Sequence, residues 1–297
     1  MPSLEIHPLS ELRDEAAALL AERYTRQRAA ESLLPEVTDF ESHIPAAGHV
    51  ATRGGRAVAY LAGAAEGGVA RAGFAGCAAS EPEALGDVFA VSAQVWDVSR
   101  FAVALPASEK PLVDAFFRLA FGCQLVWGVR EIDLSGGVEV RLHECRFGTR
   151  DDLPAVVELE QSFQRFSHTA PSLSDLRLQS AEEVASEWQG TWDDPAFTHF
   201  VCERDGAVAG HLLLYRRPGD DLRVPVDSID IALTATAERA RGEGIGRSLF
   251  AHAVAWAKEN GFRSLTVDFR TVNLLASRFW TNRGFRPQYL RLYRAVP

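Results

Sequence analysis

The clearest change of hydrophobic period along the chain falls between residues 227 and 260. Apolar residues alternate with polar or small ones from Ile229 to Thr236, which is the two-residue period of a β-strand. Three glycines follow, and apolar positions then recur every three or four residues, as in an amphipathic helix: Leu249, Phe250, Ala253, Trp256 and Ala257. We therefore predict a strand over 227–236, a glycine-rich loop and a helix over 246–260.

The residues on either side predict further strands and helices. Upstream we expect a strand over 138–147, helices over 151–165 and 174–189, and strands over 198–204 and 207–216. Downstream we expect a strand over 263–269, a helix over 273–283 and a strand over 286–295. Asp151 and Asp152 are expected to cap the first of these helices. Strands joined by helical crossovers indicate an α/β fold with a mixed central sheet flanked by helices.

The first half of the chain carries a similar pattern, which predicts an internal repeat. The hairpin-like stretch 55–60 corresponds to 205–210 at an offset of 150 residues, and 101–105 corresponds to 265–269 at an offset of 164. Phe121 and Phe285 close the two copies at the same offset of 164. A Ser-Gly-Gly break at 135–137 separates the halves. We predict two tandem domains of one fold, 1–133 and 138–297.

Composition and charge narrow the classes of partner. The formal net charge is −9 and there is no basic block, which argues against a nucleic-acid partner. The chain shows no apolar run of bilayer length and no signal-like start, so we expect a cytoplasmic protein that does not enter membranes. The four cysteines are far apart without a CxxC pair, so we expect structural thiols and neither a metal site nor a disulfide framework.

The glycine loop after residue 236 is the strongest candidate for chemistry. A strand that feeds a glycine-rich turn at the start of a helix directs several backbone N–H groups, and the positive end of the helix dipole, at one point. Arg239 and Arg241 add positive charge with planar donors suited to phosphate oxygens. An ordinary tight turn is the competing interpretation. The spacing favours a phosphate site.

Known phosphate-binding motifs fit this loop to different degrees. A P-loop is excluded, because Gly246 is followed by Arg247-Ser248 rather than by Lys-Ser or Lys-Thr. A dinucleotide-binding loop stays open, since Asp268 ends the next strand where a ribose-binding acid belongs. Against it, Arg247 occupies the third glycine position of that motif.

The chain from 138 to 297 resembles the GCN5-related N-acetyltransferases (GNAT family). Arg241-x-x-Gly244-x-Gly246 is similar to the family's pyrophosphate loop, and Arg239-x-x-Gly242-x-Gly244 matches it in a second register. The run from Asn273 to Gly284-Phe285 is similar to the family's Asn…Ala…Tyr…Gly-Phe signature, and Arg146 to Pro154 resembles its usual opening. The first half, without a glycine loop, resembles the degenerate N-terminal copy of tandem members, which implies a structural role.

This resemblance implies an acyltransferase that moves an acyl group, expected to be acetyl, from acetyl-CoA or another acyl-CoA to an amine on a small molecule or peptide. It implies that the loop holds the pyrophosphate, that the strand end contacts the pantetheine arm and that the asparagine lies near that arm. The implied coenzyme-binding residues are Thr234, Ala235, Thr236, Arg241, Gly242, Glu243, Gly244, Ile245, Gly246, Arg247 and Asn273. For Asn273 a second role, as the cap of the helix that follows, fits equally well.

Two positions near the loop are candidates for catalysis. Asp230 precedes the loop where related enzymes place a carboxylate base, and a solvated aspartate at a strand edge is the competing interpretation. Trp280 stands where the family often has a tyrosine acid, and an indole N–H is not a useful proton source. We interpret Trp280 as a packing residue. It also motivates an alternative function, an inactive module that only binds acyl-CoA.

The acceptor pocket is expected between residues 163 and 192. This region is aromatic, and acidic residues that could attract a cationic amine follow it at Asp193 and Asp194. The aromatic and histidine side chains expected to line the pocket are Phe163, Phe166, His168, Trp188 and Trp192.

Overall fold

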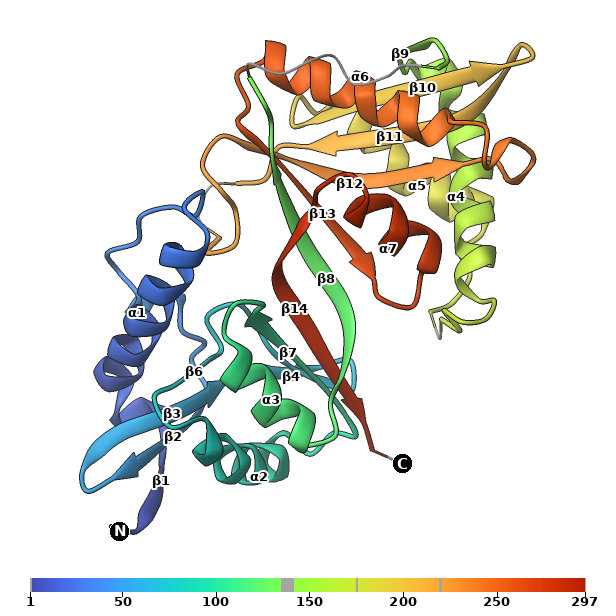
Figure 1. The fold of residues 1–297 in the computed structure, drawn as a ribbon. Coiled ribbons are helices and arrows are strands. Elements are labelled where there is room, and N and C mark those ends of the chain that lie inside the picture. The colour runs from blue at the N-terminus through green and yellow to red at the C-terminus, as the bar shows by residue number, and fades with distance from the viewer. Residues whose placement is uncertain (1, 135–141, 175, 219–220, 297) are drawn as a thin grey trace. The chain divides into compact units, whose positions relative to one another are not determined.

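The computed structural model describes the chain except for residues 1, 135–141, 175, 219, 220 and 297 (Figure 1). The chain forms two compact units. The first contains Met1–Gly128, Asp220–Arg223 and Pro287–Pro297, and the second contains Val129–Gly219 and Val224–Arg286. The predicted break at 135–137, and with it the start of the second domain at 138, lies outside the described residues.

The first unit contains two sheets with helices packed against them. Its larger sheet has the strand order β4-β5-β7-β14-β8 and its smaller sheet the order β1-β2-β3-β6. The strand β8 (Gly122–Glu131) begins in this unit and ends in the second. The other elements are β1 (Leu4–Pro8), α1 (Arg13–Ala30), β2 (Gly48–Arg53), β3 (Arg56–Ala62), β4 (Ala64–Glu66), β5 (Val69–Ala72), β6 (Cys77–Ala79), α2 (Leu85–Trp96), β7 (Arg100–Pro106), α3 (Lys110–Arg118) and β14 (Arg286–Ala295).

The C-terminal strand β14 belongs to the first unit, although the second half of the chain supplies it. It runs antiparallel to β7 from Tyr289, opposite Pro106, to Ala295, opposite Arg100. Leu292 is fully buried in the core of the first unit, and the Tyr289 hydroxyl donates a hydrogen bond to Gln27 at 2.9 Å. The hydrophobic pattern predicted this strand correctly, but not that it completes the sheet of the other unit.

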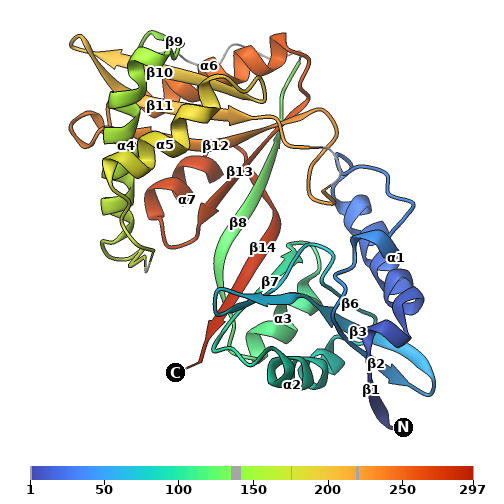
Figure 2. The same ribbon diagram turned by 180° about the vertical axis from the view of Figure 1, so that it is seen from behind.

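The second unit places helices on both faces of one sheet, whose strand order is β8-β13-β12-β11-β10-β9. Leu212 and Leu214 of β11 pack on the face covered by α6, whereas Leu213 packs with Val156 and Trp188 on the face covered by α4 and α5 (Figures 1 and 2). The elements are β9 (Cys145–Phe147), α4 (Leu153–Ser167), α5 (Ala181–Gln189), β10 (Phe197–Arg204), β11 (Ala207–Tyr215), β12 (Ser228–Thr236), α6 (Ile245–Glu259), β13 (Ser264–Arg270) and α7 (Leu274–Thr281).

Two predicted helix starts differ from the structure because of capping side chains. The turn before α4 is capped by Thr149 rather than by the aspartate pair, and Asp152 instead accepts from the Thr149 N–H and from Arg146. The helix α5 begins at Ala181 rather than near 174, because Ser180 and Glu183 form a capping box there.

The internal repeat is present, with one correction to its register. The strands β7 and β13, and the closing residues Phe121 and Phe285, correspond at the predicted offset of 164. Both hairpins turn through two residues of positive φ, Gly54-Gly55 in one copy and Asp205-Gly206 in the other, which sets an offset of 151. The predicted offset of 150 was wrong by one residue, and in a strand that slip moves every side chain to the opposite face.

In the part of the chain that the structure describes, every helix is too short or too polar to cross a membrane.

Candidate functional site

The strand β12 parts from its neighbour β13 halfway along its length. The two pair in parallel from Ser228, opposite Ser264, to Ile231, opposite Val267, and β12 then continues to Thr236. A β-bulge at Ala232 lies at this point. The adjacent residues Leu213 and Leu214 of β11 pair with Leu233 and Ile231 of β12, so Ala232 is the extra residue. Bulges of this kind redirect a strand and are common beside functional sites. The predicted residues Thr234, Ala235 and Thr236 form the part of β12 beyond the paired stretch.

The glycine loop that follows leads directly into α6. Gly242 has φ +83° and Gly244 has φ +94°, a left-handed conformation that residues with a β-carbon adopt at a cost. Gly244 is the N-cap residue of α6 and has no side chain to satisfy the N–H groups of the first turn. The amides of Ile245, Gly246 and Arg247 therefore open the helix without a side-chain cap, as in anion sites at helix N-termini.

Close packing brings the loop against the sheet and against α7. A β-carbon at Gly210 on β11 would lie 2.5 Å from Ile245 Cγ2, so the glycine lets α6 approach the strand. A β-carbon at Gly246 would lie 3.3 Å from the Phe279 ring and 3.7 Å from Thr236 Oγ1. The end of β12, the start of α6 and the helix α7 thus meet at Gly246.

Charged side chains border the loop. The Arg241 guanidinium lies 4.8 Å from the centre of the Phe166 ring at the end of α4, and Glu243 pairs with Arg204. Beside the loop lies a hollow of about 330 Å³ that is lined by Arg204, Glu243 and Arg239. The predicted loop residues and one predicted acceptor residue, Phe166, therefore lie together.

The helix α7 supplies the next two predicted residues. Asn273 caps it, since Asn273 Oδ1 accepts from the Ala276 N–H at 3.1 Å, which confirms the capping role. Its contact with a coenzyme stays a prediction. Trp280 is 3% exposed and packs edge-on against Phe250 and Phe285. The interpretation of Trp280 as a packing residue is confirmed.

Asp230 lies just before the point where β12 and β13 part. It is 1% exposed, and both carboxylate oxygens are engaged, one by the Arg217 guanidinium at 2.7 Å and one by the Thr266 hydroxyl at 2.5 Å. Thr266 is its direct partner on β13. The expectation of a solvated strand-edge aspartate is therefore wrong for this residue. Its role as a base stays a prediction.

Comparison with known proteins agrees with this geometry. The family model for the acetyltransferase (GNAT) family matches residues 155–285. These residues form a GNAT domain. A protein of Bacillus subtilis described as a putative ribosomal protein bS18-alanine N-acetyltransferase is 26% identical over 137 residues, which cover 41% of this chain and 85% of that protein.

Solved structures extend the likeness to the whole chain. A tandem GNAT protein from the clavulanic acid biosynthesis pathway aligns over 99% of both chains with a TM-score of 0.54 and 16% identity. A GCN5-related N-acetyltransferase from Sphaerobacter thermophilus aligns over 84% of this chain and 80% of its own, with a TM-score of 0.57 and 15% identity. The fold is therefore that of two tandem GNAT-like domains, and the family model matches only in the second half of the chain.

The face of the GNAT-domain sheet opposite α6 carries a buried histidine pair that the sequence analysis did not foresee. His199 Nδ1 lies 3.1 Å from His211 Nε2, and the Thr191 hydroxyl lies 3.0 Å from His199 Nε2. Trp192 stacks on His199 at 3.6 Å between ring centres, and Trp188 packs edge-on against His211. Both tryptophans pack against this pair, and their place in an acceptor pocket stays a prediction. The signal was present in the hairpin register, which places His211 opposite Val201, two residues from His199.

Glu160 on α4 is a second residue that the sequence analysis missed. Its Oε1 accepts from Gln164 at 3.2 Å, and its buried Oε2 has no hydrogen-bond partner among the described residues. Burial raises the pKa of this carboxyl above its ordinary value. The preceding residue, Leu159, packs with Ala235 of β12, so Glu160 lies on the helix that borders the parted strand.

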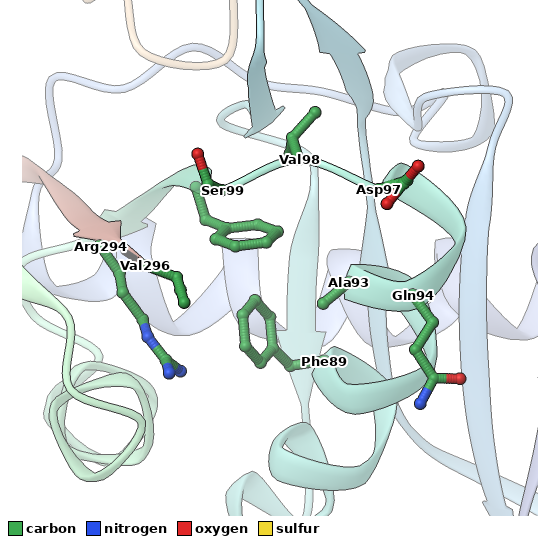
Figure 3. Close-up of a pocket in the computed structure, with 9 residues that line it drawn as sticks. Phe89, Ala93, Gln94, Asp97, Val98, Ser99, Arg294 and Val296 are labelled. Atoms are coloured by element: carbon green, nitrogen blue, oxygen red, sulfur yellow. The ribbon is translucent and has the colours of Figure 1, made fainter.

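A hollow of about 500 Å³ in the first unit combines one cation, Arg294, with the C-terminal end of a helix. Figure 3 shows that it lies at the end of α2, beside Asp97, Ser99 and Arg294. The C-terminal end of a helix presents carbonyl oxygens and partial negative charge, which repel an anion. Among the described residues, no group of three or more histidine, cysteine, aspartate or glutamate side chains is placed to hold a metal ion.

Proposed function

We propose that the GNAT domain transfers an acetyl group from acetyl-CoA to an amine, with the coenzyme lying between the parted strand β12 and the start of α6. One observation carries this proposal: β12 leaves β13 at a bulge, and the glycine loop after it leads into a helix N-terminus that has no side-chain cap. An extended ligand that adds to the free edge of a strand and ends in a phosphate matches both features.

The residues that would hold the coenzyme follow from this placement. The amides from Gly242 to Arg247 would bind the pyrophosphate, and the Arg241 guanidinium would leave the Phe166 ring to pair with it. The backbone from Thr234 to Thr236 would hydrogen-bond the pantetheine arm. A backbone N–H of the same strand would polarise the thioester carbonyl and stabilise the oxyanion that forms when the amine attacks.

The reaction needs a proton acceptor more than a proton donor. The attacking amine must be neutral, so a base must remove a proton from its ammonium form or from the intermediate. A thiol is far more acidic than an alcohol, as the cysteine side chain shows with its pKa of about 8.5, so a thiolate departs with less help from an acid than an alkoxide needs. A tryptophan at position 280 is therefore compatible with turnover.

Two carboxylates compete for the role of base. Asp230 is the residue predicted from the sequence, and it would act from the point where the strands part. Glu160 is favoured by its raised pKa and by an oxygen without a partner among the described residues. Substituting each residue separately distinguishes them.

One relative suggests which class of amine the domain acetylates. Because the Bacillus subtilis relative is described as acting on an alanine of a ribosomal protein, peptides with a free N-terminal alanine are the first acceptors to test. Small amines and polyamines form the second group, because the acidic residue Asp194 follows the predicted acceptor region, whereas Asp193 is paired with Arg150.

The test is a thiol-release assay with acetyl-CoA over this panel of amines. We expect release of free CoA that depends on one class of amine and stops when that amine is blocked. Saturable acetyl-CoA binding without turnover on any amine would favour the inactive module instead. Binding of NADH without binding of acetyl-CoA would favour the dinucleotide interpretation based on Asp268.

A further inference from the structure

Two cysteines of the second unit meet on neighbouring strands. Cys145 on β9 and Cys202 on β10 are direct partners in the antiparallel register, and their sulfurs lie 2.8 Å apart. Both are thiols in this structure, and the separation is within about 1 Å of a disulfide bond length. They are 57 residues apart in the sequence, so this proximity depends wholly on the fold.

The strand geometry at this position suits a disulfide. The Gly148 N–H donates to the His199 carbonyl at 2.9 Å, which makes these two residues a hydrogen-bonded pair. Because pairs alternate along an antiparallel ladder, Cys145 and Cys202 form a non-hydrogen-bonded pair, in which the side chains approach most closely. The usual Cα separation of such pairs, about 4.5 Å, falls at the lower end of the range that disulfides span.

The two thiols have complementary exposure and reactivity. Cys202 is fully buried, whereas Cys145 is half-buried and within reach of a small reagent. The hydrogen bond from the Cys145 thiol lowers the pKa of Cys202, which favours its thiolate. The other two cysteines differ, since burial raises the pKa of Cys77 to about 12 and also raises that of Cys123.

The segment before Cys145 rests on the coenzyme loop. The Leu142 and His143 amides donate to Ser248 Oγ at 2.9 and 3.0 Å, in the first turn of α6. His143 Nε2 lies 2.9 Å from the Glu243 carbonyl oxygen, and a β-carbon at Gly244 would lie 2.5 Å from Leu142 Cδ1. A bond at Cys145 would therefore hold this segment beside the phosphate loop.

We propose that Cys145 and Cys202 form a reversible redox site whose disulfide fixes β9 and residues 142–145 against the sheet. The oxidant is a low-molecular-weight disulfide. Transfer of the Cys145 proton to Cys202 gives the Cys145 thiolate, which attacks one of the oxidant's sulfurs, forms a mixed disulfide and releases one thiolate. This thiolate takes up the Cys202 proton and leaves as a thiol. The Cys202 thiolate then attacks the Cys145 sulfur and releases the second thiol. Two protein thiols are oxidised and one small disulfide is reduced to two thiols.

The test is equilibration of the full chain with mixtures of oxidised and reduced glutathione, followed by alkylation and mass analysis. We expect the wild type to lose two of its four alkylatable thiols together, with residues 145 and 202 joined in one cross-linked peptide. Cys123→Ser, which keeps the pair, should lose two of its three alkylatable thiols and form the same cross-link. Cys145→Ser should form no such cross-link.

Two physical readouts test the fixing of β9. The oxidised wild type should melt about 5 °C or more above the reduced form, since the bond closes a long loop of the unfolded chain. Hydrogen exchange at the Leu142 and His143 amides should slow at the same time, and neither change should occur in Cys145→Ser.

Four alkylatable thiols at every glutathione ratio would overturn the redox site, as would a cross-link to Cys77 or Cys123. A cross-link between 145 and 202 that leaves both the melting temperature and the exchange rates unchanged would overturn the fixing of β9.

Discussion

The Asp230 carboxylate is held by two partners that come from different parts of the chain. Arg217 is 13 residues away and Thr266 is 36 residues away, and both contacts depend on the register of the strands. The sequence indicated a carboxylate before the loop, but not its burial or its ion pair. Asn273 was predictable because helix capping depends on nearby residues, and Trp280 because a large aromatic side chain is usually buried whatever its partners, whereas the surroundings of Asp230 depend on strand register.

Asp230→Asn separates the two roles of this residue. If Asp230 is the base, kcat should fall by about 10²–10⁴-fold while the affinity for acetyl-CoA is kept. The loss of the ion pair should also lower the free energy of unfolding by about 1–3 kcal/mol, because Arg217 loses its anionic partner. Steady-state kinetics and thermal unfolding measure the two effects.

Thr266→Val is the matched control, since it removes one hydrogen bond to the same carboxylate and leaves the carboxylate itself. It should keep kcat within a few-fold of the wild type. An unchanged kcat in Asp230→Asn, together with a large loss in Glu160→Gln, would transfer the role of base to Glu160.

At the scale of elements, the loop and its helix were the most predictable part of the site. The change from a two-residue to a 3.6-residue period, with three glycines between, fixed β12 and α6 to within two residues. The bulge at Ala232 and the parting of β12 from β13 were not predictable, because the apolar–polar alternation of the sequence continues without a break at residue 232. The histidine pair was missed for a similar reason, since it requires the hairpin register and the position of α5.

The histidine pair between the β10–β11 hairpin and α5 makes the stability of the domain depend on pH. Burial lowers the pKa of His199 to about 4 and, together with repulsion from His199, that of His211 to about 3. The folded state therefore favours the neutral rings, whereas the unfolded chain takes up protons near pH 6.5. The contribution to stability is complete above about pH 6.5 and is lost progressively as the pH falls towards 4.

Melting temperatures between pH 7.5 and 4.5 test this dependence. The double variant His199→Gln/His211→Gln should show a shallower decline below pH 6.5 than the wild type. His252→Gln, which removes a histidine packed on the opposite face against Phe200, should keep the steep decline. Equal slopes in the wild type and the double variant would contradict the assignment of this acid sensitivity to the pair.

At the scale of the whole molecule, the sequence predicted the duplication. It did not predict that the last strand, β14, joins the sheet of the first unit. The offset of 164 residues links β7 with β13 and the two closing phenylalanines, and these landmarks are local. The strand β14 has the same hydrophobic pattern whichever unit it completes, so only three-dimensional pairing with β7 assigns it to the first unit. The structural role of the first unit stays a prediction.

The duplication also bears on how many coenzyme molecules a chain binds. The first copy keeps the helix α2 at the position of α6, but α2 follows Ser80 to Ala84, which contain no glycine. The start of α2 therefore has no counterpart of Gly242 and Gly244, whose left-handed backbone would let a phosphate approach the N–H groups of α6. We therefore expect one coenzyme site in each chain, in the second unit.

Calorimetric titration of the full chain with acetyl-CoA tests this claim most directly, with two variants at opposite ends of α6. Gly242 (φ +83°) and Gly261 (φ +80°) both have open space where a β-carbon would lie, so valine strains the backbone similarly at either position. We predict one site per chain in the wild type and in Gly261→Val, and at least about tenfold weaker binding in Gly242→Val. Two sites per chain, or equal affinity in Gly242→Val and Gly261→Val, would contradict the account.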